Sequence, residues 1–275
     1  MSPELKSFRS YNKPPVFERV ASLQCSVDEE IFARGLESWK TLVEPDFPIY
    51  EPLQQWLYKS IVRDEMVLLD PTQGTLELTP RFSKKTSAEG FDWSIRCSPE
   101  QFTMNMHSSP ESSGERRYPK LHYEYARWLP KWLEHFKPVK IHTLEMLYLN
   151  VLNIDTIPLF VTPDGLQLGQ VIKLFPPIGS EYKSAIPPYE CTLNLALKER
   201  EGSFVSLKVL DYPPKGGHLA VRLDISCRTG ITPGTEDNPE KILELLNWCH
   251  ERIIFQFEDV FTNEAKTQFE PISLS

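Results

Sequence analysis

The segment that most constrains the fold is residues 141–154, IHTLEMLYLNVLNI, because its apolar side chains occupy odd and even positions alike. Successive side chains of a β-strand point to opposite faces, so a strand with this pattern has two apolar faces. Strands of this kind are typical of the middle of a sheet that is covered on both sides. We therefore expect residues 141–154 to form a central strand that is buried on both faces.

A strand with only one buried face is expected near the start of the chain. In residues 16–27, VFERVASLQCSV, apolar and polar residues alternate. Asp28 is suited to cap a following helix, whose apolar residues between positions 31 and 43 recur at helical spacing. The expected inner side chains of the strand are Phe17, Ala21, Leu23, Cys25 and Val27, and the outer ones are Glu18, Ser22, Gln24 and Ser26.

Further elements follow in a similar order in both parts of the chain. Pro119 is suited to the start of one long helix, and Asn238 with Pro239 to the cap and start of the last one. A short helix is expected over residues 162–175. Further strands are expected in parts of 49–69 and at 75–82, 91–97, 101–107, 191–198, 204–211 and 218–228.

Two halves of this kind, residues 16–137 and 138–270, can join edge to edge into one sheet. We therefore predict an α+β fold in which a mainly antiparallel sheet has long helices packed on one face. This is a helix-grip or saddle-like arrangement of two pseudo-repeated strand–helix–strands–helix halves. Residues 1–15 are expected to form an N-terminal extension, and the whole chain a single compact unit.

Composition narrows the class of protein. The 275 residues are 40% hydrophobic and 25% charged, which is typical of a globular chain. The net charge of -8 argues against nonspecific attraction to phosphate backbones or anionic membranes. The five cysteines are widely spaced and form no CxxC pair, so we expect reduced core thiols. No segment resembles a signal peptide or a membrane helix of ~20 apolar residues, and we expect a cytoplasmic protein.

His250 and Glu251 begin a pattern that resembles the HExxH motif of zinc proteases. That motif requires a second histidine four residues after the first, so that both rings reach one metal ion. Ile254 occupies that position here. The sequence also has no GxSxG elbow, Walker loop or GxGxxG turn. We therefore expect a packing or hydrogen-bonding role for His250, and we predict no metal site, no cofactor and no catalytic residues.

Residues 158–179, PLFVTPDGLQLGQVIKLFPPIG, are rich in large apolar side chains and proline and nearly free of charge. If part of this segment is exposed, it would form a docking surface for another protein. The alternative is that the segment packs beneath the sheet. The candidate docking residues are Leu159, Phe160, Leu174 and Phe175.

Arginine residues supply the candidates for anion binding. Arg222, Asp224 and Arg228 alternate along one expected strand and therefore share a face. Paired arginine donors suit phosphate or carboxylate ligands, whereas the simpler interpretation is a solvated face with a cross-strand ion pair. Arg116 and Arg117 belong to the strongest local basic cluster and complete the candidate set for nucleic-acid binding.

Several short patterns resemble an uncharacterised, sporadically distributed bacterial protein family of about this length. They are a PP-x-x-E opening strand, a Y-x-N central strand and a closing helix with a histidine and an FED triplet. The residues that match are Pro14, Pro15, Glu18, Tyr148, Asn150, His250 and Glu258. The resemblance spans residues 14–270, although Leu147 stands where the family often has arginine. It implies the α+β layout and an accessory gene in a mobile-element or defence locus, and it implies no activity.

These observations favour a noncatalytic binding or regulatory accessory protein that acts through protein–protein interaction. We expect its partner to be encoded nearby. The alternative hypothesis is a nucleic-acid or nucleotide-binding module that uses an open sheet face. An enzyme whose site is assembled from scattered residues is a third hypothesis.

Overall fold

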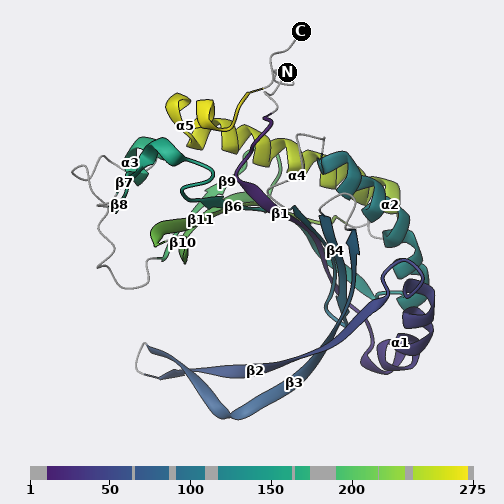
Figure 1. Ribbon diagram of the computed structural model, residues 1–275. Coiled ribbons are helices and arrows are strands. Elements are labelled where there is room, and N and C mark those ends of the chain that lie inside the picture. The colour runs from purple at the N-terminus through teal and green to yellow at the C-terminus, as the bar shows by residue number, and fades with distance from the viewer. Residues whose placement is uncertain are drawn as a thin grey trace.

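The computed structural model describes residues 11–63, 66–86, 91–108, 117–162, 165–173, 190–215, 217–232 and 238–271. One sheet of nine strands runs through the molecule in the order β2-β3-β4-β5-β1-β6-β11-β10-β9. All neighbouring strands of this sheet are antiparallel. The long helices lie together on one side of the sheet (Figure 1). The predicted α+β fold is therefore confirmed.

The elements follow one another along the chain with these bounds. The first part contains β1 (Val16–Ser26), α1 (Glu29–Val43), β2 (Ile49–Arg63), β3 (Met66–Thr86), β4 (Phe91–Ser98), β5 (Gln101–Ser108) and α2 (Arg117–Phe136). Next come β6 (Lys140–Leu152), the short 3-10 helix η1 (Pro158–Phe160), β7 (Val161–Thr162), β8 (Gly165–Leu166) and α3 (Leu168–Val171). The last part contains β9 (Glu190–Ala196), β10 (Phe204–Lys215), β11 (His218–Gly230), α4 (Pro239–Val260) and α5 (Asn263–Gln268).

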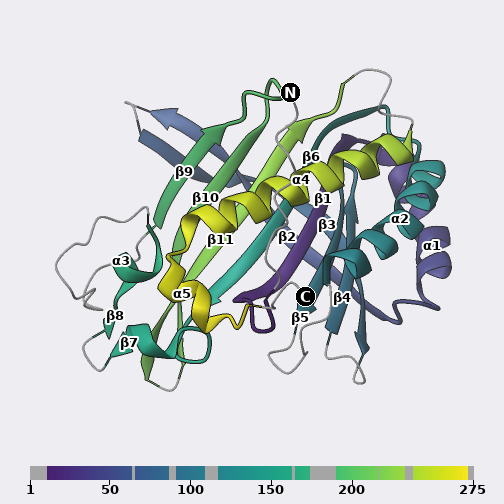
Figure 2. The same ribbon diagram turned by 90° about the horizontal axis from the view of Figure 1, so that it is seen from above.

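The two parts of the chain meet where β1 pairs with β6 in the middle of the sheet. Strands β2 to β5 extend from β1, and strands β9 to β11 extend from β6, as Figure 2 shows from above. The central position expected for residues 141–154 is thus confirmed. The helices α1, α2 and α4 all pack on the same face, as predicted, so in the described part of the chain helices cover only one of the two apolar faces of this strand.

The sheet is strongly curved, with α1, α2 and α4 along its convex side (Figure 1). The hairpin of β2 and β3 continues the curve, so that it lies opposite β10 and β11 across the concave side. Strand twist and coiling of this kind are general properties of antiparallel sheets. We call the surface of the sheet that points away from these helices the concave face.

Aromatic side chains fill the space between the convex side of the sheet and its helices. Trp39 of α1 meets Trp128 of α2 edge to face, with their ring centroids 6.0 Å apart. Trp132 stacks on Phe102 of β5 at 5.3 Å. All four side chains are fully buried, and burying a large aromatic or aliphatic side chain contributes roughly 1.5–3 kcal/mol. This aromatic layer fixes α1 and α2 against the first half of the sheet.

The helix caps predicted at Asp28 and Asn238 are confirmed, whereas α2 begins at Arg117, two residues before the start predicted at Pro119. The Asp28 side chain accepts hydrogen bonds from the backbone nitrogens of Glu30 and Ile31 at 3.0 and 3.1 Å. Asn238 accepts one from the Lys241 nitrogen at 3.2 Å. These bonds satisfy backbone donors that have no partner within the first turn of a helix.

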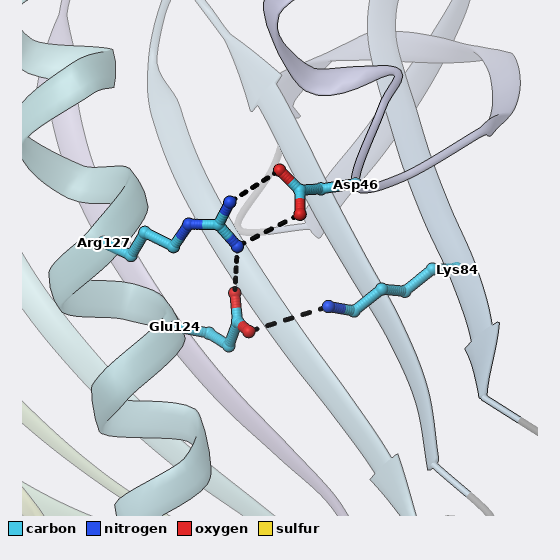
Figure 3. A network of polar contacts seen from close by, with 4 residues as sticks. All are labelled: Asp46, Lys84, Glu124 and Arg127. Carbon is cyan, nitrogen blue, oxygen red and sulfur yellow. Dashed lines mark hydrogen bonds and ion pairs between the residues drawn. The ribbon is translucent and has the colours of Figure 1, made fainter. Parts of the chain in front are cut away.

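A network of charged side chains joins α2 to its neighbours (Figure 3). Both terminal nitrogens of Arg127 donate to the carboxylate of Asp46, at 3.1 and 2.8 Å. This bond is the main reason why the pKa of Arg127 is raised. Glu124 lies between Arg127 and Lys84 of β3, at 3.8 and 3.6 Å. Partly exposed pairs of this kind each stabilise by about 0–1 kcal/mol, so the network chiefly orients α2 over the strands.

Two predicted elements differ from the structure. The strand expected at 75–82 is part of a longer one, because β3 runs from Met66 to Thr86 and includes the end of the expected region 49–69. The helix expected over 162–175 is reduced to α3, and Val161 and Thr162 form a short strand instead. Both of those residues are β-branched, which favours extended backbone. The rest of the expected helix, beyond residue 173, lies outside the described residues.

Candidate functional site: the concave face of the sheet

Cross-strand pairs place polar side chains in rows across the concave face. One row contains Arg81, Arg96, Thr103, Ser22, Glu145 and Arg228, contributed by β3, β4, β5, β1, β6 and β11 in that order. A second row contains His107, Glu18, Leu149, Asp224 and Lys208. Between them lie Ser94, Asn105, Val20, Leu147, Ser226 and Ser206. Residues directly opposite in antiparallel strands share one face, so these rows form a continuous surface.

The middle of this surface is apolar. Leu147, Leu149 and Val151 of β6 point to it, because they alternate with the side chains that face the helices. Leu149 and Val151 are already buried by their neighbours, whereas Leu147 and Val20 of β1 are half-buried. The second apolar face of the central strand thus lies at the centre of the concave face.

Phe17 adds to this apolar centre, which corrects the expectation that it faces inward with Ala21. The register of β1 against β6 shifts between Val16 and Glu18, as in a β-bulge. The Phe17 ring packs against His107 of β5 and Tyr212 of β10, with ring centroids 5.5 and 6.0 Å apart. Phe17 therefore lies with the side chains of the concave face.

Charged groups of both signs surround the apolar centre. Asn105 Nδ2 donates to Glu18 Oε1 at 2.6 Å on the side of β5. On β11, Arg222 donates to Asp224 Oδ2 at 2.8 Å. Burial raises the pKa of Asp224 from its ordinary value, and Arg222 acts in the opposite direction. The surface therefore carries paired charges rather than an excess of one sign.

Several polar atoms of this surface are buried and lack a hydrogen-bond partner among the described residues. They include the side-chain oxygen Oδ1 of Asn105, the Oδ1 oxygen of Asp224 and the Nε atoms of Arg81, Arg96 and Arg222. Asn105 and Asp224 are only 8% and 7% exposed. Buried polar groups are nearly always hydrogen-bonded in native proteins, so these atoms are available to water or to a bound partner.

The structure brings together only some of the residues that the sequence suggests for anion binding. Arg222 and Arg228 both lie on the concave face. Arg222 pairs with Asp224 two residues along the same strand, and Lys208 lies directly opposite Asp224 on β10 and lowers the pKa of its carboxyl, in agreement with the cross-strand ion pair of the simpler interpretation. Arg116 lies outside the described residues. Arg117 is the first residue of α2, but its side chain is not among those that the structure describes.

The apolar candidates for docking do not form one surface in the described residues. The Leu159 side chain is 73% exposed, whereas Phe160 is buried at 7%. Leu174 and Phe175 lie outside the described residues. One exposed leucine is common on protein surfaces and needs no functional explanation.

Sequence reasoning missed the part of the concave face contributed by β3, β4 and β5. Arg81, Arg96 and Asn105 are far apart in the sequence, and only the pairing of their strands brings them together. Glu18 was noticed for its place in the opening strand, but its partner Asn105 was not. The sequence did contain one indication of this surface. Residues 141–154 have two apolar faces, and the face that the helices leave uncovered lies on the concave side.

His250 belongs to a separate cluster beneath α4, on the convex side. Its Nδ1 lies 2.7 Å from Tyr148 Oη, and its ring stacks on Tyr118 at 3.6 Å. Arg19 also hydrogen-bonds to Tyr148 and is buried with it. Arginine only donates hydrogen bonds, so the Tyr148 hydroxyl accepts from Arg19 and still has its own proton and a second lone pair for the bond to His250. His250 therefore has the packing and hydrogen-bonding role that the sequence indicated.

Two other residues of the short sequence motifs, Asn150 and Glu258, also connect parts of the fold. Asn150 is fully buried and donates to the carbonyl oxygens of Leu223 and Tyr148 at 2.9 and 3.2 Å. Glu258 accepts a hydrogen bond from Tyr11 at 2.7 Å and one from Lys266 at 3.2 Å. These contacts hold β6 against β11 and attach Tyr11 and Lys266 of α5 to α4. Glu18 is the motif residue that reaches the concave face.

In the portions of the chain that the structure describes, no three His, Cys, Asp or Glu side chains lie close enough together to hold a metal ion. None of the helices in those portions combines the length and apolarity needed to cross a membrane. Compared with protein-family models, curated proteins and solved structures, the chain shows no significant match. Function is therefore inferred from the concave face itself.

Proposed function

We propose that this chain is a noncatalytic binding protein that docks a polypeptide partner on the concave face of its sheet. The observation that carries the proposal is the apolar centre formed by Phe17, Val20 and Leu147 within a polar surround. Protein-binding surfaces commonly have this organisation, with an apolar core and a polar rim. The curvature of the sheet would let such a partner contact strands of both halves (Figure 1).

The central strand supports the same proposal. Leu147, Leu149 and Val151 give β6 a second apolar face, but the described helices cover only the first. Strands with two apolar faces usually have cover on both. A polypeptide partner would supply the missing cover and remove the half-buried Leu147 from water.

The charges on the concave face favour polypeptide over nucleic acid. Glu18 and Asp224 lie on the same surface as Arg96 and Arg222. Binding to a phosphate backbone relies on an excess of cations, which release counterions from the nucleic acid. A surface of paired charges, on a chain with a net charge of -8, better suits a partner that also carries both signs.

The docking site proposed here differs from the segment that the sequence suggested. Phe160 is buried, so residues 158–162 offer Leu159 as their one strongly exposed apolar side chain among the described residues. An accessory role in a bacterial defence or mobile-element locus, with a partner encoded nearby and a cytoplasmic location, stays part of the proposal. Its support is the resemblance of the short sequence motifs.

A matched pair of variants tests the proposed function. Leu147→Lys places a charge in the centre of the concave face, whereas Tyr123→Lys changes a residue of α2 that is 69% exposed. Wild type and both variants are immobilised and exposed to an extract of the native host. We expect a partner that Leu147→Lys fails to retain and Tyr123→Lys still retains. Equal retention by both variants would overturn the proposal, and salt-sensitive binding of oligonucleotides that Leu147→Lys abolishes would favour the nucleic-acid alternative.

A further inference from the structure

Two arginines stand side by side at one end of the concave face. Arg81 of β3 and Arg96 of β4 are directly opposite each other in the antiparallel ladder. Their Cβ atoms are therefore about 4.5–5.5 Å apart, and like charges in this position are destabilising. Burial lowers the pKa of Arg96, and the neighbouring Arg81 lowers it further. Placing two cations together in this way favours an anion between or above them.

The acidic neighbours only partly compensate this charge. Glu51 Oε2 lies 3.5 Å from a terminal nitrogen of Arg81. A charge-assisted hydrogen bond between such groups is usually shorter, about 2.7–2.9 Å. Glu18 raises the pKa of Arg96 through its charge, but one of its oxygens already accepts from Asn105. The arginine pair therefore keeps donor capacity that these carboxylates do not use.

Unpaired atoms at the same place give an independent indication of a ligand. The Nε atoms of Arg81 and Arg96 are buried and have no hydrogen-bond partner among the described residues. The side chains are still reachable, because that of Arg81 is 35% exposed. On the neighbouring strand β5, Asn105 is only 8% exposed. Its Oδ1 has no hydrogen-bond partner among the described residues. The guanidinium groups thus keep unused donors, and Asn105 an unused acceptor, at this end of the surface.

We infer that Arg81 and Arg96 form an oxyanion-binding site that takes a carboxylate side chain of the docked polypeptide. This inference rests on the proposed function for the identity of the occupant. A carboxylate offers two oxygens in the plane of the guanidinium fork, and the pair of forks can hold it from both sides. The acidic side chain would sit two strands from Val20 at the apolar centre and fix the position of the partner along β3 and β4.

Nuclear magnetic resonance of the arginine Nε–Hε groups tests the site without the natural partner. Arg81→Lys and Arg96→Lys each remove one resonance, which assigns it. Wild-type protein is then titrated with succinate as a small dicarboxylate, with inorganic phosphate, and with sodium chloride at matched ionic strength. We expect saturable shifts of both resonances with succinate, and about a tenfold weaker apparent affinity at the remaining arginine in each variant.

Arg34 of α1 is the internal control, because it is exposed on the convex side and paired with Glu30 at 2.6 Å. Succinate shifts at Arg81 and Arg96 that are no larger than the shift at Arg34 would overturn the inference. Saturation by phosphate at much lower concentration than by succinate would overturn the choice of a carboxylate. The wild-type titration requires no variant to fold. If Leu147→Lys loses the partner but succinate leaves the Arg81 and Arg96 resonances unshifted, the proposed function stands and this site fails. If Leu147→Lys retains the partner, the proposed function itself fails.

Discussion

Tyr148 Oη and His250 Nδ1 lie 2.7 Å apart and join the central strand to the last long helix. The two residues are 102 positions apart in the sequence. Tyr148 is nearly fully buried at 2% exposure, so its hydroxyl depends on this bond and on Arg19. The contact ties α4 to β6 on the side of the sheet opposite the proposed docking surface.

Removing the imidazole should destabilise the protein without affecting partner docking. His250→Ala leaves the Tyr148 hydroxyl with one partner fewer and removes the ring that stacks on Tyr118. We expect a loss of roughly 1–3 kcal/mol in the free energy of unfolding, the usual cost of an unsatisfied buried polar group. Urea denaturation measures it. In a double-mutant cycle with Tyr148→Phe, additive losses would contradict a direct hydrogen bond.

The same residue predicts a pH dependence of stability. Burial lowers the pKa of His250 to about 3, with Arg19 and His122 acting in the same direction. In the unfolded chain its pKa returns to about 6.5, so between these values the unfolded state binds the extra proton. Stability is then complete above pH ~6.5 and falls by about 1.4 kcal/mol per pH unit as the pH decreases below it.

Urea denaturation at a series of pH values between 7 and 4 checks this slope. Since other groups also titrate in that window, the test compares wild type with His250→Gln, which cannot take up the proton. We expect a shallower fall of stability in the variant. Identical slopes for both proteins would show that His250 is not held neutral by its surroundings.

Gly35 of α1 allows α2 to approach closely. A Cβ at this position would meet Phe136 Cε1 at 3.0 Å and His135 Nε2 at 3.3 Å. Alanine gains up to about 1 kcal/mol in helix propensity, but crowding a packed contact costs about 1–3 kcal/mol. We therefore expect Gly35→Ala to lower the thermal midpoint, whereas Glu37→Ala on the exposed side of α1 should leave it nearly unchanged. A higher midpoint for Gly35→Ala would show that α2 can yield.

Asn150 should be needed to hold β6 against β11. Its amide nitrogen donates to the Leu223 carbonyl at 2.9 Å, and the residue is fully buried. Asn150→Leu keeps the approximate volume but leaves that carbonyl without its side-chain donor, so we expect a loss of about 1–3 kcal/mol. Denaturant unfolding measures the loss, and the exposed change Asp155→Leu near the end of the same strand is the control. Equal stability of wild type and Asn150→Leu would rule out this role.

Local patterns predicted much of the fold from the sequence. Asp28 and Asn238 act as helix caps because each needs only the backbone of the next few residues. The apolar pattern of residues 141–154 likewise predicted a central strand, since only a central strand can bury so many side chains. The β-bulge that turns Phe17 to the concave face has no comparable local signature.

The candidate site was much less predictable. Arg222 and Arg228 were recognised because alternation within one strand places them on a common face. Arg81 and Arg96 become neighbours only through the register of β3 against β4, and a shift by one residue would turn them to opposite faces. Register depends on the turn and on packing across the whole sheet, and periodicity within either strand does not reveal it.

Site-specific photo-crosslinking tests the central proposal most directly. p-Benzoylphenylalanine is placed at Leu147 in the centre of the concave face and, as a control, at Tyr123, which is 69% exposed on α2. Both proteins are irradiated in the native host, and adducts are identified by mass spectrometry. The proposal predicts an adduct with one defined polypeptide from position 147 and not from position 123. An adduct with that polypeptide from position 123 alone, or with nucleic acid from position 147, would contradict it.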